Sequence, residues 1–253
     1  MGAPLGYDEA MATSLHAHVV EHLGSRIVSG FIPADTILLA ADLEQQLKVS
    51  RSVIREAVRV LAQCGLVTST KRVGIRVQGP SKWNPFDSLV IRWRLASNQQ
   101  GVQLRSLTEL RISVEPMAAE LAAQYSPAEF REELMTLSAQ MNHYGRLGDL
   151  RRFLELDIRF HAVLLAASGN EMFANLAIPI GETLRGRTDL GLMPERPHEE
   201  ALAWHQAVAD AVSNHDALAA RQNMENIMRR THSEICGIWA GQERLFIDPA
   251  GPR

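Results

Sequence analysis

Apolar and polar residues recur with a helical period over most of the first 80 residues, and with a strand period over one short stretch. The helical pattern predicts helices over residues 13–29, 40–47 and 51–63. Two runs of β-prone residues, 66–70 and 75–77, flank a basic turn and predict a hairpin. Helices followed by a hairpin in this order are typical of a winged helix-turn-helix domain.

Beyond residue 86 only the helical period is found. Apolar residues recur every three or four positions over 86–97, 103–124, 127–146, 149–168, 170–187, 199–213 and 216–240. Helices without strands predict an all-α bundle of six to seven helices. Residues 79–87 contain two prolines and a glycine without periodicity, which predicts a linker. We therefore expect a mainly α protein, with a winged helix-turn-helix at 10–78 and a helical domain at 88–240.

Composition narrows the class of protein. A chain of 253 residues with 46% hydrophobic content is long enough for two domains with their own cores. Its two cysteines, Cys64 and Cys236, have no metal-ligand spacing and suit a reducing compartment. No segment reaches the roughly 20 apolar residues of a membrane span, and the N-terminal region lacks a signal-peptide pattern. These features predict a cytoplasmic protein without a membrane partner.

Basic residues are concentrated in one block, although the net charge of the whole chain is −3. Between residues 48 and 76 the only acidic residue is Glu56. The basic residues of this block are Lys48, Arg51, Arg55, Arg59, Lys71, Arg72 and Arg76. Such a block indicates a nucleic-acid-binding surface, because phosphate neutralisation needs dense lysine and arginine. On charge alone, a solvated charged surface is the alternative.

The predicted helix 51–63 separates its basic side chains from its apolar ones. Arg51, Arg55 and Arg59 follow at intervals of four residues and form a ridge beside the apolar stripe. We expect Arg51, Ser52 and Arg55, near the helix N-terminus, to contact base edges in the major groove. Arg59 lies further along and is expected to contact a phosphate.

The turn of the predicted hairpin adds a second set of DNA contacts. We expect Lys71, Arg72 and Gly74 to lie against the DNA backbone or the minor groove. The alternative is that the arginines of the block pair with Glu56 and neighbouring acids. A single winged helix reads only a short half-site, so the DNA-binding interpretation implies a homodimer on a palindromic operator.

This region resembles the GntR family of bacterial transcription regulators. The resemblance rests on the sequence SRSVIREA at 50–57, followed by Leu61, Gly65-Leu66-Val67 and Gly74-Ile75-Arg76-Val77. It covers nearly all of residues 13–78 and implies a winged helix that binds an operator. One departure is Leu38-Leu39-Ala40-Ala41. At this point, where the chain leads into the second helix, the family usually has a sequence of the Leu-Pro-Ser-Glu type.

Polar residues interrupt the apolar stripes of the helical region. Arg111 lies on such a stripe and needs an anion there, either Glu115 one turn further on or a bound carboxylate. Asp157 and His161 are four residues apart on the inward face of their helix, and His205 lies on the inward face of another. These three side chains suit Zn²⁺ or a similar divalent ion, while the alternative is a set of satisfied core residues.

The helical region is similar to the FCD effector domain of the FadR-type GntR subfamily. The motifs are Glu109-Leu110-Arg111, Glu115-Pro116-Met117-Ala118-Ala119, residues 157–161, Ser168-Gly169-Asn170 and His205. The resemblance implies a metal held by an aspartate and three histidines, at which organic acids bind. Where the third histidine is expected, this chain has Ile227 beside Asn226. Either three protein ligands hold the ion together with water or effector, or the polar groups bind the effector directly.

The segment 83–87, followed by Val90-Ile91-Arg92-Trp93, most resembles the gluconate- and galactonate-responsive members. This implies an aldonate effector, with its carboxylate on Arg111 or the metal and its hydroxyls on nearby polar groups. The candidate effector-binding residues are Arg111, Asp157, His161, Arg187, His205 and Asn226. We therefore expect a repressor of a sugar-acid catabolic operon, not an enzyme, that such an acid releases from DNA.

Three alternatives remain at this point. The regulator could respond to another organic acid, or its bundle could serve dimerisation only. A metal-dependent hydrolase would use Asp157, His161 and His205 to activate water. That reading lacks an HExxH or nucleophile motif and leaves the basic winged helix unexplained.

Overall fold

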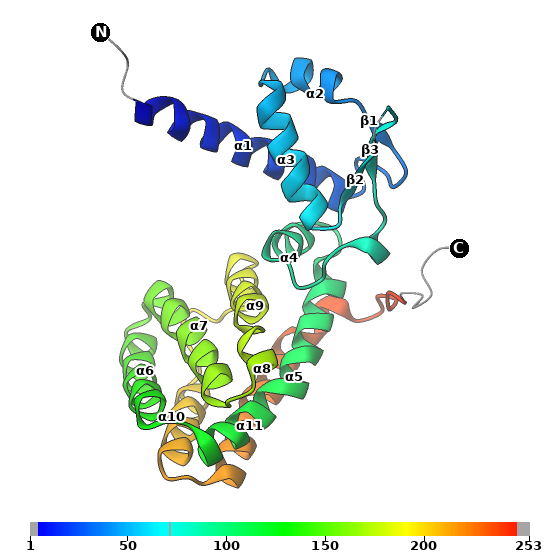
Figure 1. The fold of residues 1–253 in the computed structure, drawn as a ribbon. Helices are drawn as coiled ribbons and strands as arrows, with labels where there is room; N and C mark the ends of the chain where they lie inside the picture. The colour runs from blue at the N-terminus through cyan, green and yellow to red at the C-terminus, as the bar shows by residue number, and fades with distance from the viewer. Residues whose placement is uncertain (1–4, 71, 247–253) are drawn as a thin grey trace. The chain divides into compact units, whose positions relative to one another are not determined.

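The computed structural model describes residues 5–70 and 72–246 and contains two compact units (Figure 1). The first unit contains the described residues up to Gln100, together with 244–246. The second unit is Gly101–Glu243. The mainly α fold with a small N-terminal sheet confirms the predicted fold class.

The first unit is a winged helix-turn-helix with an additional helix. Its elements are α1 (Leu5–Val28), β1 (Ile37–Leu38), α2 (Ala40–Leu47), α3 (Arg51–Gln63), β2 (Val67–Thr70), β3 (Gly74–Val77), the 3₁₀ turn η1 (Pro80–Lys82) and α4 (Ser88–Leu95). The predicted helices 40–47 and 51–63 and the hairpin are confirmed. The helix predicted to begin at residue 13 already begins at Leu5.

The sheet has the order β1-β3-β2, and both pairs are antiparallel. Strand β1 was not predicted, because two residues are too few to show a period. It pairs with β3 through Ile37 and Leu38, directly beside Gly74. Gly74 has a φ of +122°, and a Cβ there would lie 2.9 Å from the Leu38 carbonyl oxygen. A glycine at this position therefore lets β1 approach the hairpin.

The core of the first unit includes α4. Trp83, Val90 and Trp93 are buried with the apolar faces of α1 and α3. Helix α1 approaches α4 closely at Gly24, where a Cβ would lie 2.2 Å from the Trp93 ring. Residues 88–95, predicted to belong to the helical bundle, instead pack on the core of the winged helix.

Asp87 holds the start of α4 in place. Its side chain accepts hydrogen bonds from the backbone N–H groups of Leu89 and Val90, as an N-cap does. It also accepts a hydrogen bond from the Cys64 thiol at 3.5 Å. Burial and the Asp87 charge raise the pKa of Cys64 to about 12, so this thiol stays protonated.

Helix α2 lacks a side-chain cap at its N-terminus. Leu39 occupies the N-cap position with extended φ and ψ and is half exposed. Its carbonyl oxygen accepts from the N–H groups of Asp42 and Leu43, but its side chain has no atom that can accept a hydrogen bond. Replacing Leu39 by serine should raise the free energy of unfolding by about 1 kcal/mol, because a hydroxyl can accept from a free N–H of the first turn. Thermal unfolding of Leu39→Ser measures the gain. Leu39→Ala is the matched control, and an equal gain in both variants would contradict the capping explanation.

The second unit is a helical bundle. Its helices are α5 (Gln100–Tyr125), α6 (Ala128–Leu147), α7 (Leu150–Ala167), α8 (Glu171–Ala174), α9 (Ala177–Asp189), α10 (Glu199–Ser213) and α11 (Ala217–Ile235), followed by the 3₁₀ turn η2 (Cys236–Trp239). Helix α6 packs between α7 and α10, α11 packs on α10, and α9 packs on α7. The predicted number of bundle helices is confirmed for the described residues.

The single helix predicted at 170–187 is wrong, because two helices are found there. Helix α8 ends at Ala174, and α9 begins at Ala177. Pro179 lies in the first turn of α9, where a missing backbone N–H costs nothing. In a continuous helix its ring would meet the carbonyl group of residue 175.

Among the residues that the structure describes, no helix combines the length and the apolar character needed to cross a membrane.

Candidate functional sites: a DNA-binding surface and a polar cavity

Helix α3 presents its basic side chains on its exposed side. Arg51, Ser52, Arg55 and Arg59 are exposed, and the apolar residues between them are buried. The side chains of Arg55 and Arg59 are 78% and 74% exposed. Arg51, Ser52 and Arg55 also line a hollow with residues of the wing, among them Ser69. The candidate base-reading residues thus share one accessible surface.

The alternative partner, Glu56, holds these arginines only loosely. Arg55 Nε lies 3.4 Å and Arg59 Nη1 3.9 Å from its carboxylate oxygens. Such exposed ion pairs contribute little to stability, so the guanidinium groups can leave Glu56 for a phosphate or a base. Ser50 stands at the N-cap of α3, yet its hydroxyl contacts the Ser52 hydroxyl at 2.8 Å and does not cap the helix.

The hairpin turn is described in part. Lys71 lies outside the described residues. Arg72 is exposed with a left-handed φ of +66°, as expected for the tip of a tight turn. Gly74 is half-buried, and its place is explained by the approach of β1 rather than by accessibility.

A buried ion pair lies inside the bundle. Arg111 on α5 is 1% exposed and binds Glu115, one turn further on, through Nε at 2.5 Å and Nη2 at 3.3 Å. Glu115 is completely buried. Burial opposes ionisation of Glu115, but Arg111 and His161 lower its pKa to about 2. Two anions were considered as partners of Arg111, Glu115 and a bound carboxylate. The structure contains the pair with Glu115.

Two histidines are oriented by oxygen atoms on one side of each ring. His205 on α10 donates from Nδ1 to the Ala201 carbonyl oxygen at 2.7 Å. His161 on α7 places Nδ1 at 2.6 Å from Glu115 Oε2. In both rings Nε2 then lies on the Asp157 side, at 3.3 Å from Asp157 Oδ1 in each case. Histidine ligands of metal ions are commonly oriented through the other ring nitrogen in this way.

Two of the three separations between the inward atoms match those of metal ligands. Tetrahedral zinc with bonds of about 2.0–2.1 Å separates neighbouring ligand atoms by about 3.3–3.4 Å. Asp157 Oδ1 lies at this distance from both imidazole nitrogens and has no hydrogen-bond partner. The three side chains are buried, and their ligand atoms lie within 4.8 Å of one another. This donor set therefore fits a divalent ion.

The Asp157 carboxylate lies among groups that carry or can take up positive charge. His161 Nε2 lies 3.3 Å from Asp157 Oδ1 and 3.2 Å from Arg111 Nη2. His205 Nε2 faces the same carboxylate oxygen and has no hydrogen-bond partner. Burial would lower the pKa of His161, but Glu115 and Asp157 raise it to about 9. The pKa of Asp157 lies well below its usual value, because both histidines stabilise its charge against the effect of burial.

A second buried arginine faces the same cavity. Arg187 on α9 is 5% exposed, and both it and Arg111 line the cavity beside Asp157 and the two histidines. Burial and the positive charge of Arg111 lower the pKa of Arg187. Arg187 Nε and Arg111 Nη1 are buried without hydrogen-bond partners. Two guanidinium groups with free donors in one cavity have the chemistry to bind an anion that carries several oxygen atoms.

The cavity is small and is covered by the segment between α9 and α10. The space open to the centre of a water molecule is about 50 Å³, enough for a few waters. Met193, Pro194 and Pro197 of this segment line it. A ligand larger than a few water molecules does not fit this space without a rearrangement of the lining side chains.

The side chains that α11 contributes to the cavity differ from the predicted one. Asn226 does not line the cavity, whereas Ile227 does. Thr231 and Glu234 line it as well, and with Ile227 they repeat at the four- and three-residue spacing of one helix face. That spacing was the signal available in the sequence. Arg230 and His198 complete the lining on this side.

Comparison with known proteins agrees with both units. Residues 15–77 match the bacterial regulatory proteins of the gntR family, and residues 106–230 match the FCD domain. The uncharacterized HTH-type transcriptional regulator YieP of Escherichia coli K12 is 29% identical over 89% of this chain and 98% of its own length. The galactonate operon transcriptional repressor of the same organism is 29% identical over 81% of this chain and 89% of its own length.

Solved structures share the fold. Lar of Listeria monocytogenes is 15% identical, with coverage of 88% of this chain and 97% of its own and a TM-score of 0.56. Escherichia coli McbR/YncC is 16% identical, with coverage of 89% and 98% and a TM-score of 0.51. The matching domains and relatives are DNA-binding regulators and not enzymes, which excludes the hydrolase alternative. The chain belongs to the GntR family of bacterial transcription regulators and carries an FCD effector domain behind its winged helix.

Proposed function

We propose that this protein is a homodimeric repressor of a sugar-acid catabolic operon and that an aldonate such as galactonate or gluconate releases it from its operator. The observation that carries the proposal is the pair of buried guanidinium groups, Arg111 and Arg187, with unpartnered N–H donors in one cavity. A carboxylate compensates their charge, and the hydroxyl groups of a sugar acid suit the remaining donors and acceptors. The likeness to the galactonate operon transcriptional repressor supports the same class of effector.

A divalent ion, Zn²⁺ by the spacing of its ligands, is part of the proposal. Asp157, His161 and His205 would hold it and would leave coordination positions open to carboxylate or hydroxyl oxygens. Arg111 fixes the ligand set indirectly, because it binds Glu115, which orients His161. Glu115 occupies two N–H donors of Arg111. The effector's carboxylate would therefore bind Nη1 of Arg111 together with Arg187.

The exposed face of α3 is the proposed reading surface. Arg51, Ser52 and Arg55 would contact base edges, while Arg59 and the hairpin tip with Arg72 would contact the backbone. Two copies of this surface related by a two-fold axis would read a palindromic operator.

Operator release is the experiment that tests this function. A binding fragment is first selected from random duplex DNA with the full-length protein as purified. Addition of D-galactonate or D-gluconate should then weaken binding at least about tenfold, since typical allosteric coupling is about 1–3 kcal/mol. Fluorescence anisotropy of the labelled fragment measures this change.

Galactitol, which has the hydroxyl groups but no carboxylate, is the matched control and should leave DNA binding unchanged. Treatment with a chelator should remove the response to the acids, and added Zn²⁺ should restore it. Unchanged operator affinity at saturating concentrations of both aldonates would contradict the proposed effector class.

A further inference from the structure

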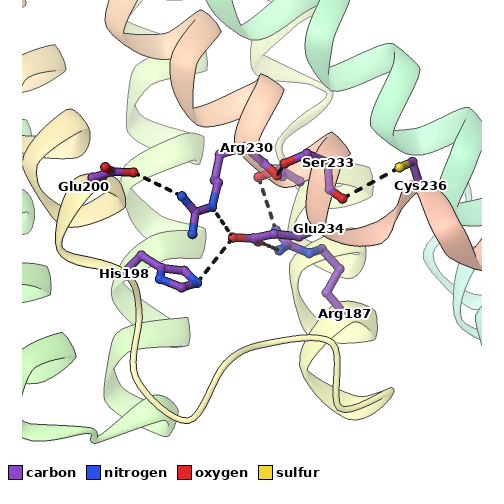
Figure 2. A network of polar contacts seen from close by, with 8 residues as sticks. Arg187, His198, Glu200, Arg230, Ser233, Glu234 and Cys236 are labelled. Atoms are coloured by element: carbon purple, nitrogen blue, oxygen red, sulfur yellow. Dashed lines mark hydrogen bonds and ion pairs between the residues drawn. The ribbon is translucent and has the colours of Figure 1, made fainter.

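The cavity contains a carboxylate of its own at one of the two buried arginines. Glu234, in the last turn of α11, places Oε2 at 3.3 Å from Arg187 Nη2 (Figure 2). Its other oxygen lies 2.7 Å from Arg230 Nε and 3.9 Å from His198 Nε2. Glu234 therefore links a buried cation of α9 with a cation of its own helix and with the start of α10.

The contacts of Glu234 are of unequal strength. The bond to Arg230 is short, and Arg230 itself is anchored by Glu200 at 3.1 Å. The bond to Arg187 is long and uses a single oxygen. If Glu234 lost Arg187, its charge would still be compensated by Arg230. The cost of release is therefore small for the glutamate.

Arg187, in contrast, has no second carboxylate within ion-pair distance among the described residues. Thr231 Oγ1 accepts from its Nη1 at 3.5 Å, and its Nε has no hydrogen-bond partner. The guanidinium group is thus incompletely paired although its side chain is only 6% exposed. A ligand carboxylate that binds two of its nitrogens would satisfy it better than Glu234 does.

We propose that Glu234 is a specificity-determining residue that competes with the effector's carboxylate for Arg187. This rests on the proposed function, because it assigns the carboxylate of the effector to that arginine. Glu234 keeps the buried cation paired in the absence of ligand. A neutral polyol cannot replace it without leaving Arg187 uncompensated, so the cavity selects carboxylate anions over uncharged sugars.

Glu234→Gln tests the competition. Glutamine has the same shape and retains an acceptor for Arg187 but no longer competes with a negative charge. Binding of D-galactonate, D-gluconate and acetate to the full-length protein is measured by calorimetry at constant ionic strength. At least one carboxylate should bind about tenfold more tightly than to the wild type, the size expected when a charge-assisted hydrogen bond becomes a neutral one.

Glu200→Gln is the matched control. Glu200 binds the same Arg230 but does not touch Arg187, so its replacement should leave all three affinities unchanged. Circular dichroism and thermal unfolding show whether each variant is folded. Should Glu234→Gln fail to fold, Glu234→Ala takes its place in the same measurements.

The outcomes separate this inference from the proposed function. If only acetate binds, and binds more tightly to Glu234→Gln, the competition stands and the aldonate assignment fails. If an aldonate binds wild type and Glu234→Gln equally, or Glu200→Gln gives the same gain, the competition is overturned and the proposed function stands. If no carboxylate binds either protein, both are wrong.

Discussion

Replacing Arg111 by methionine should lower the free energy of unfolding by about 3–5 kcal/mol, the usual cost of removing one partner of a buried ion pair. The variant leaves Glu115 fully buried, with the His161 ring as its only remaining partner among the described residues. Methionine fills much of the space of the arginine stem, so the loss of charge compensation dominates over a cavity effect. Urea denaturation monitored by circular dichroism measures the change.

Removal of the second charge is the control for this prediction. Arg111→Met combined with Glu115→Gln takes away the orphaned carboxylate and should recover a large part of the lost stability. The coupling energy from the double-mutant cycle then reports the ion pair itself. A single variant within about 1 kcal/mol of the wild type would show that Glu115 finds another cation or water.

Replacing Arg55 by alanine should reduce affinity for the selected operator about 10- to 100-fold, which corresponds to about 1–3 kcal/mol for one bidentate base contact. Affinity for random DNA should change much less, so the ratio of specific to non-specific binding falls. Because the Arg55 side chain is 78% exposed and pairs only with Glu56 at 3.4 Å, the melting temperature should stay the same. Anisotropy titrations on both DNA fragments measure the ratio.

Arg59→Ala is the comparison for Arg55→Ala. As a phosphate contact it should weaken binding to both fragments alike and reduce the salt dependence of binding by about one counterion. If Arg55→Ala behaves in the same way as Arg59→Ala, the division between base-reading and phosphate-contacting arginines is wrong.

Helices α2 and α3 and the hairpin of the winged helix were predictable because their signals are local. The basic ridge on α3 follows from a four-residue interval, and its bounds from the turn at Lys48 and the glycine at Gly65. The polar cluster of the bundle was predictable for the same reason. Asp157 and His161 share one helix, and the apolar stripes fix which way they point. The inward direction of His205 was predictable in the same way, from the apolar stripe of its own helix.

Features that depend on contacts between distant parts of the chain could not be predicted from the sequence pattern. Strand β1 is too short to have a period, and α4 shows the same periodicity whichever core it packs on. The choice of Ile227 rather than Asn226 as a cavity residue depends on the rotation of α11 against α10. The contacts of Glu234 with Arg187 and His198 join residues far apart in sequence, so no local spacing predicts them.

The two thiols of the chain differ in their accessibility to a labelling reagent. Cys64 is buried and held protonated beside Asp87, while Cys236 is partly accessible at the end of α11, two residues from Glu234. Since alkylating reagents attack the thiolate form, they discriminate between the two positions. A maleimide fluorophore on the natural sequence would thus attach at the C-terminal end of α11, with no engineered attachment point.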